Sequence, residues 1–212
     1  MSRLLRTLDR AKAIAYSTAT AVGRAGLFVG LAVCGGIGSS WYLSSQPSAL
    51  TTESVGPWVN WVSAGRVEAD PYTRARFARI GSLPVNAAST QTFEARADNT
   101  GQRLHSSCEY AVEGPVPDAQ WWSVGVYSDR GQLIPNAAER YAFNAGTLAQ
   151  NPDGTFLVSL ARDARPGNLL PTGGAGRLAL VLTLHQAPSQ AKLVRARAQA
   201  TALPNIRRVQ CR

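Results

Sequence analysis

RLALVLTLH, residues 177–185, is the clearest secondary-structure signal in the chain. Leucine stands at every second position, at Leu178, Leu180, Leu182 and Leu184, and the residues between them are smaller or polar. Successive side chains of a β-strand point to opposite faces, so the four leucines line one face. The pattern therefore predicts a strand whose leucine face packs against a second layer.

Three clusters before this strand predict tight turns, because each ends in glycine with Asp or Asn ahead of it. They are DNTG (Asp98–Gly101), SDRG (Ser128–Gly131) and NPDG (Asn151–Gly154). Runs of aromatic and β-branched residues flank them and predict strands near 92–97, 103–112, 121–128, 131–135, 139–144, 154–161 and 177–186. The sequence thus predicts a mainly β domain, an antiparallel sandwich of two sheets.

One short helix is expected before these strands, in ADPYTRARFARIGSLP, residues 69–84. Asp70 is suited to cap its N-terminus, Pro71 to its first turn and Gly81 to its end. The helix is expected to show three arginines to solvent or to lipid headgroups: Arg74, Arg76 and Arg79.

The N-terminal part predicts one transmembrane helix. No charged residue occurs from Ala25 to Thr52, and the apolar run Gly26–Leu43 is about as long as a bilayer core requires. Five basic residues precede it and the next one after Arg24 is Arg66, which places the N-terminus in the cytoplasm. A cleaved signal sequence is disfavoured because no good cleavage site follows. We therefore expect a basic cytoplasmic segment (1–24), a transmembrane helix (25–43), a linker (44–57) and a periplasmic sandwich domain (58–212), in a single-pass protein of the bacterial inner membrane.

Small residues recur every fourth position in the predicted membrane helix, at Gly26, Gly30, Cys34 and Gly38. Such a row lets a second helix approach closely. The general abundance of glycine in membrane helices explains the row equally well, and both explanations stay open.

Two cysteines, Cys108 and Cys211, fall in the predicted periplasmic domain, where disulfides persist. A bond between them would close a loop of roughly 100 residues, and the sequence leaves open whether the two side chains meet. The net charge of +9 arises mainly at the two ends of the chain. Neither an aromatic RNA-binding motif nor a recognition helix accompanies it, so nucleic acid is not expected as a partner.

Motifs of catalysis are missing from the sequence: there is no G-x-S-x-G, no H-E-x-x-H and no phosphate loop. His105 and Cys108 would point to opposite faces of a strand, which disfavours a shared metal ion. Glu109 and Glu113 would lie some 13–14 Å apart along a strand, too far for a glycosidase pair. We expect no catalytic residue, no metal and no cofactor.

A tryptophan doublet opens the strand predicted at 121–128, and its neighbourhood resembles a known family. DAQWWSVGVYSDRGQLIPN, ERYAF, NPDGTFLVSL, NLLPTGGAGRLALVLTLHQA and LPNIRRV, in this order, are similar to the domain of unknown function 1214 family. The resemblance covers roughly residues 58–212. The matching positions are Trp122, Tyr127, Gly131, Asn136, Arg140, Tyr141, Asn151, Asp153, Gly154, Asn168, Leu170 and Pro171.

The resemblance implies a jelly-roll-like sandwich and no established reaction. It implies that Trp122 is a core residue, and packing is also favoured for Trp121. Longer relatives carry a second module, numbered 1254, before this one, whereas this chain has a membrane helix there. A separate protein with the 1254 module is therefore an expected partner of this stand-alone, anchored version.

Two functional hypotheses are compatible with the sequence. The first is a binding or accessory protein of the cell envelope that holds a protein partner or a glycan or lipid ligand. The second is an enzyme that acts on envelope carbohydrate or lipid. The candidate ligand-binding residues for either are Asn136, Arg140, Tyr141 and Asn168, although such residues also serve as braces of turns and strand ends.

Overall fold

A computed structural model describes residues 2–185 and 203–212 of the chain, with the backbone alone for residues 2–15. Met1 and residues 186–202 lie outside the described residues, and with them part of the basic C-terminal stretch and the last residue of the strand predicted over 177–186. The chain divides into two compact units, Met1–Gln46 and Pro47–Arg212.

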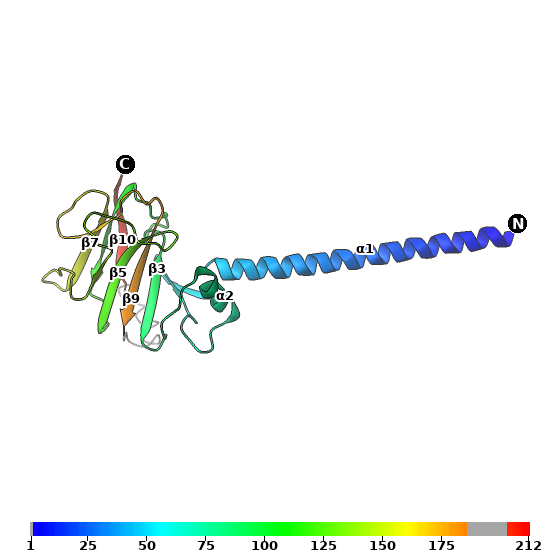
Figure 1. The fold of residues 1–212 in the computed structure, drawn as a ribbon, viewed down its shortest axis with the longest axis horizontal. Coiled ribbons are helices and arrows are strands. Elements are labelled where there is room, and N and C mark those ends of the chain that lie inside the picture. Colours follow the sequence, from blue (N-terminus) through cyan, green and yellow to red (C-terminus); the bar gives the residue numbers. More distant parts are fainter. Residues whose placement is uncertain (1, 186–202) are drawn as a thin grey trace. The chain divides into compact units, whose positions relative to one another are not determined.

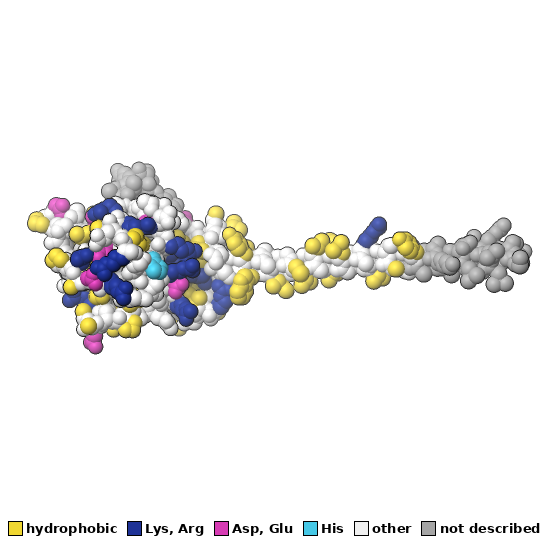
Figure 2. Space-filling view, turned by 90° about the horizontal axis from the view of Figure 1, so that it is seen from above, with side chains coloured by type: hydrophobic (Ala, Val, Ile, Leu, Met, Phe, Trp, Pro, Cys, Tyr) yellow, Lys and Arg dark blue, Asp and Glu magenta, His cyan; other side chains and the backbone are white. Residues whose placement is uncertain are grey.

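The first unit is a single helix, α1 (Ser2–Ser45). Its segment Thr18–Ser45 is long and apolar enough to cross a membrane, with a mean hydropathy of 1.6 and no buried part. A helix of 28 residues is about 42 Å long, more than the ~30 Å of a hydrocarbon core. Figure 2 shows hydrophobic side chains at intervals along the visible face of the described part of this helix. The segment is a candidate single-pass membrane anchor or a signal sequence.

The second unit is mainly β, with one short helix (Figure 1). Its elements are β1 (Thr52–Val55), β2 (Trp58–Trp61), α2 (Pro71–Ile80), β3 (Thr90–Ala95), β4 (Cys108–Pro115), β5 (Trp121–Ser128), β6 (Ala142–Asn144), β7 (Thr155–Ala161), β8 (Asn168–Pro171), β9 (Leu178–His185) and β10 (Asn205–Cys211).

These strands form two sheets. The larger sheet has the order β1-β2-β3-β9-β5-β6 and the smaller has the order β10-β4-β7-β8. All pairs are antiparallel except β7 with β8, so the prediction of a purely antiparallel sandwich is wrong at that pair. The connection between these two parallel strands is short, because β8 begins beside Val158, near the middle of β7. The six-residue loop 162–167 covers that distance.

The core lies between the two sheets. Its composition confirms the prediction that the leucines of β9 share one buried face. Leu178, Leu180, Leu182 and Leu184 are all buried, and so is Trp122 of β5. The Trp122 ring stacks on Phe156 of β7, with ring centroids 5.2 Å apart, which joins the larger sheet to the smaller one. Burial of such large side chains is the main source of stability in a sandwich of this size.

Local signals of the sequence are confirmed at the three turns and at α2. Gly101, Gly131 and Gly154 have φ of 82°, 75° and 75°, the left-handed region that glycine enters without strain. Asp70 caps α2 by accepting a hydrogen bond from the backbone N–H of Thr73. Its pKa lies below the ordinary carboxyl value: burial alone would raise it, but hydrogen bonds from Ser63 and Thr73 outweigh burial.

Two further expectations differ from the structure. The stretch expected to be a linker, residues 44–57, contains an edge strand, β1, whose β-branched Thr52 and Val55 pair with β2. Arg76 was expected on the surface with Arg74 and Arg79, but its side chain is only 13% exposed. Its guanidinium lies 4.6 Å from the centre of the Trp61 ring and faces Glu94, so it fastens α2 to the larger sheet.

Candidate functional site

Asn136 and Arg140, two of the predicted ligand-binding residues, belong to one loop between β5 and β6. The Asn136 side-chain amide donates to the carbonyls of Ile134 and Arg140 and accepts from the Arg140 N–H. The Arg140 guanidinium lies over the ring of Phe143, 5.4 Å from its centre. Asn136 therefore closes this loop on itself, which is the bracing role that such residues often have.

Asn168, at the start of β8, braces another part of the chain. Its side chain accepts from the Ala149 N–H and donates to the carbonyls of Ala149 and Leu157, and it is buried. Tyr141 contributes its backbone carbonyl to the N–H of Val126. The polar groups of the two asparagines are thus satisfied by two different segments. A shared ligand site at these four residues stays a prediction.

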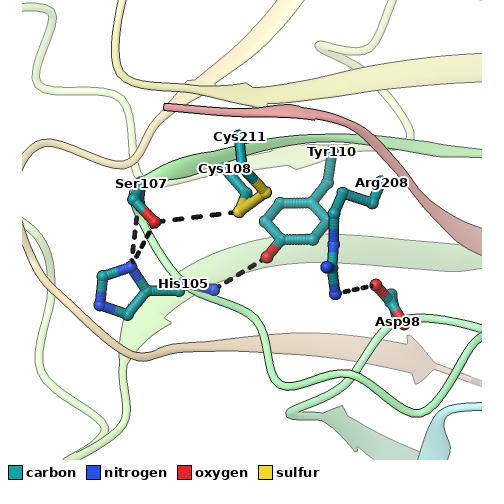
Figure 3. The surroundings of a disulfide bond; sticks show 7 residues. All are labelled: Asp98, His105, Ser107, Cys108, Tyr110, Arg208 and Cys211. Carbon is teal, nitrogen blue, oxygen red and sulfur yellow. Dashed lines mark hydrogen bonds and ion pairs between the residues drawn. A yellow bond between two sulfur atoms is a disulfide. The ribbon is translucent and has the colours of Figure 1, made fainter.

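The structure joins Cys108 to Cys211 by a disulfide bond (Figure 3). The two residues are direct partners across β4 and β10, with Cα atoms 3.9 Å apart. β10 was not predicted as a strand. It buries Ile206 fully, and the bond ties this strand to the edge of the smaller sheet.

Asp98 makes a second tie between β10 and the rest of the domain, through Arg208 (Figure 3). Its carboxylate, in a side chain only 1% exposed, accepts a 2.7 Å hydrogen bond from Arg208 of β10. It also accepts from Thr100 and from the Gln102 N–H, within the DNTG turn. Burial alone would raise the pKa of Asp98, but these hydrogen bonds hold it below the ordinary value. The carboxylate therefore stays charged and joins the turn to β10.

The carboxylates considered for catalysis are held by arginines. Glu109 forms an ion pair with Arg165 at 2.6 Å, and hydrogen bonding from Arg165 lowers the pKa of Glu109. Glu113 pairs with Arg207 at 3.1 Å. The His105 ring contacts the Ser107 hydroxyl, and Cys108 is in the disulfide. Across residues 2–185 and 203–212, no group of three or more His, Cys, Asp or Glu residues is placed to hold a metal ion.

A surface that the sequence did not assign lies on the outer face of the larger sheet. Trp121 is 41% exposed, so the prediction that it packs like Trp122 is wrong. Its ring lies 5.0 Å from the ring of His185, its direct partner on β9, and the Nδ1 atom of His185 is 3.0 Å from the Thr90 hydroxyl on β3. The strand alternation that buries Trp122 already required Trp121 to face outward.

A row of three hydroxyl side chains runs beside this aromatic pair. Ser123 of β5 is paired with Thr183 of β9, and Thr183 is paired with Thr92 of β3. These residues lie two positions from Trp121, His185 and Thr90 along their strands, so both rows share one face of the sheet. We call these six residues the Trp121 platform. It offers an aromatic ring, an imidazole and the hydroxyl groups of Ser123, Thr183 and Thr92 to a ligand, whereas Thr90 is buried and contacts the imidazole of His185.

Comparisons with known proteins identify the domain. Residues 89–189 match the model of a family described as protein of unknown function (DUF1214). The VPA0106 protein from Vibrio parahaemolyticus has a similar structure, with a TM-score of 0.52 and 19% identity over 68% of this chain and 36% of that one. An uncharacterised protein from Burkholderia cenocepacia gives a TM-score of 0.40 with 19% identity, over 58% of this chain and 30% of that one. No curated protein matches the chain.

The chain thus spans about a third of the length of the Vibrio protein, and at this identity the likeness concerns the fold alone. The family match covers β3 through β9, which include both the leucine strand and the tryptophan doublet. The resemblance inferred from the ordered motifs is confirmed over this segment: residues 89–189 match the model of the DUF1214 family.

Proposed function

We propose that the protein is a single-pass, membrane-anchored binding protein of the bacterial cell envelope. In this proposal α1 holds the chain in the inner membrane with its N-terminus in the cytoplasm. The second unit, a jelly-roll-like sandwich, is displayed in the periplasm and binds a glycan of the envelope through the Trp121 platform.

Two observations support the location. The candidate span Thr18–Ser45 follows a segment with five basic residues, the arrangement that keeps an N-terminus in the cytoplasm. The disulfide between Cys108 and Cys211 lies in the unit after the span, and such bonds persist in oxidising compartments. Both features support the proposal that this domain lies outside the cytoplasm.

The exposure of Trp121 supports binding and is the observation on which this function depends. A tryptophan left 41% exposed on a sheet face costs hydration free energy that a ligand removes by covering the ring. Sugars suit such a surface because their C–H faces stack on aromatic rings and their hydroxyls exchange hydrogen bonds with Ser, Thr and His side chains. The row Ser123, Thr183 and Thr92 supplies these groups next to the ring.

The alternative of an envelope enzyme has less support, because the asparagines proposed for its site brace backbone segments. A protein partner, such as a separate 1254-module protein, remains an alternative occupant of the platform. The glycine row of α1 is another candidate contact: beyond the adjacent residues and the helix's own backbone, a Cβ atom added at Gly26, Gly30 or Gly38 would meet no described atom within 4 Å.

A pull-down tests the binding function. Full-length protein in mild detergent is incubated with purified cell-wall glycan and, separately, with an envelope extract read by mass spectrometry. We compare the wild type with Trp121→Ala and with Leu157→Ala, a matched control whose side chain is 43% exposed on the smaller sheet. Glycan retained by the wild type and the control but lost with Trp121→Ala supports the proposal.

Other outcomes of the pull-down are equally informative. Glycan retention that Trp121→Ala leaves unchanged contradicts the platform as the binding site. A protein captured instead of glycan, and lost with Trp121→Ala, makes the platform a protein interface. A protein lost only when α1 is replaced by an unrelated membrane helix places the contact in the anchor. Alkaline phosphatase fused after residue 212 tests the location, since it is active only outside the cytoplasm.

A further inference from the structure

Four apolar side chains project into solvent around helix α2, in the segment from residue 66 to residue 85. Val67 is 86% exposed, Ile80 52%, Leu83 94% and Val85 59%. Single exposed apolar residues are common on proteins, whereas apolar side chains gathered on one surface mark an interaction site, and these four fall within twenty residues. These side chains belong to the β2–α2 loop, the last turn of α2 and the loop after it.

The backbone holds this group in place. The Gly81 N–H bonds to the Ala78 carbonyl and the Ser82 N–H to the Phe77 carbonyl, the paired bonds of a Schellman end. On the inner side of the helix, the Phe77 ring meets Trp61 edge to face at 6.5 Å. Helix α2 is therefore docked on β2 through its inner side, while its outer side and the loop 82–86 stay exposed.

A backbone hydrogen bond fixes the far end of the exposed loop 82–86. The Ala87 N–H bonds to the Gly65 carbonyl, 3.1 Å away. Gly65 has φ of 74°, and a Cβ atom there would lie 1.9 Å from the Val85 carbonyl oxygen, so the two backbone segments are in close approach. Leu83 and Val85 are thus carried by a loop tied at both ends.

Basic residues accompany the apolar group. Arg66, Arg74 and Arg79 are exposed, and Arg74 donates a 2.8 Å hydrogen bond to the carbonyl of Val67, which places its guanidinium beside an apolar member of the group. Of the acidic residues here, Asp70 is engaged in capping α2, and Glu68 is exposed. The surface therefore combines apolar tips with a net positive charge.

We propose that Val67, Ile80, Leu83 and Val85, with Arg66, Arg74 and Arg79, form a membrane-contact surface that binds an anionic lipid bilayer. Apolar tips enter the acyl boundary, while guanidinium groups pair with lipid phosphates at headgroup depth, as in interfacial anchors. Anionic lipid is favoured over a protein partner by the charge and by the candidate membrane span in the same chain. The inference rests on the proposed membrane anchoring.

Site-specific fluorescence of the full-length protein in nanodiscs tests this surface. In a Cys34→Ser background, Ser82→Cys is labelled with an environment-sensitive dye next to Leu83. The matched control is Gln132→Cys, which is exposed in the SDRG hairpin beside the 53% exposed Leu133. Nanodiscs contain phosphatidylcholine alone or with phosphatidylglycerol, and lipids with a nitroxide on the acyl chain serve as quenchers.

We expect at least twofold quenching of the dye at position 82 in phosphatidylglycerol discs and little at position 132. Each basic residue contributes about a few-fold in affinity for an anionic surface, so Arg74→Glu with Arg79→Glu reduces the quenched population on the order of tenfold. Leu83→Ser with Val85→Ser abolishes quenching by removing the apolar tips. Near-UV circular dichroism verifies that both double variants are folded.

Three results would overturn the inference. The first is equal quenching at positions 82 and 132, or none at 82. The second is quenching as strong in phosphatidylcholine alone, which removes the requirement for anionic lipid. The third is a chain that does not co-elute with nanodiscs, which refutes the anchor and this surface together, whereas co-elution without quenching refutes this surface alone.

Discussion

Loss of the bond between Cys108 and Cys211 is expected to destabilise the second unit through the unfolded chain. The two cysteines are 103 residues apart in sequence, and the chain-entropy relation gives about 4.7 kcal/mol at 25 °C for a loop of ~100 residues. In the folded state β10 keeps other contacts: Ile206 is fully buried, and Arg208 pairs with Asp98. The folded structure should therefore survive Cys108→Ala with Cys211→Ala, and the free energy of unfolding should fall by about 3–5 kcal/mol.

Urea unfolding of the full-length protein in mild detergent measures this loss. Tryptophan fluorescence follows the transition, because Trp58 and Trp122 are buried in the core. The double variant is expected to unfold at a lower urea concentration and with a steeper dependence on urea, since its unfolded chain exposes more surface without the cross-link. Cys34→Ser is the control, because it removes the free cysteine and leaves the bond intact.

A loss below about 1 kcal/mol with an unchanged urea dependence would refute the reasoning, since the cross-link would then not constrain the unfolded chain. An altered near-UV spectrum of the folded double variant would refute it differently. It would show that the bond holds β10 in place, so that the remaining contacts of Ile206 and Arg208 are insufficient.

Four further substitutions have expected effects on stability in the same assay. Asp98→Asn breaks a buried ion pair with Arg208 and should cost about 3 kcal/mol at pH 7. Because folding lowers the pKa of Asp98, its contribution to the free energy of unfolding is present above the ordinary carboxyl pKa and is lost as the pH falls through the pKa of the folded state. A difference in the free energy of unfolding between wild type and variant that does not shrink below about pH 4 would contradict this. Trp122→Ala should cost about 3–5 kcal/mol and Trp121→Ala less than about 1, and similar costs would contradict the assignment of one ring to the core and one to the surface. Gly65→Ala should cost about 2 kcal/mol, because its φ of 74° and a facing carbonyl both oppose a Cβ atom, and a neutral result would contradict that close approach.

Features that depend on neighbouring residues in sequence were predictable, and those that depend on distant partners were not. The leucine alternation of β9, the glycines of the three turns and the caps of α2 follow from local geometry. β10 escaped prediction because a single residue, Ile206, is fully buried, and the strand exists through pairing with β4. β8 has four residues, and its parallel pairing has no local signal.

The candidate site shows the same division. The polar residues picked from motifs, such as Asn136 and Asn168, are engaged by nearby backbone groups, which a motif cannot distinguish from ligand binding. The Trp121 platform arises from register between three strands that are far apart in sequence. Pairing of Trp121 with His185 could be recognised only once β5 and β9 were known to be neighbours.

The position of β10 has a consequence for the order in which the domain is completed. Its partner β4 precedes it by about a hundred residues, and the indole N–H of Trp58 donates to the carbonyl of Pro204, 146 residues later. At a synthesis rate of roughly 5–20 residues per second, β4 waits about 5–20 s with one edge unpaired and Cys108 without its partner. An open strand edge can join another chain during that interval. The nascent protein therefore has a defined period of vulnerability, which ends when β10 emerges and covers β4.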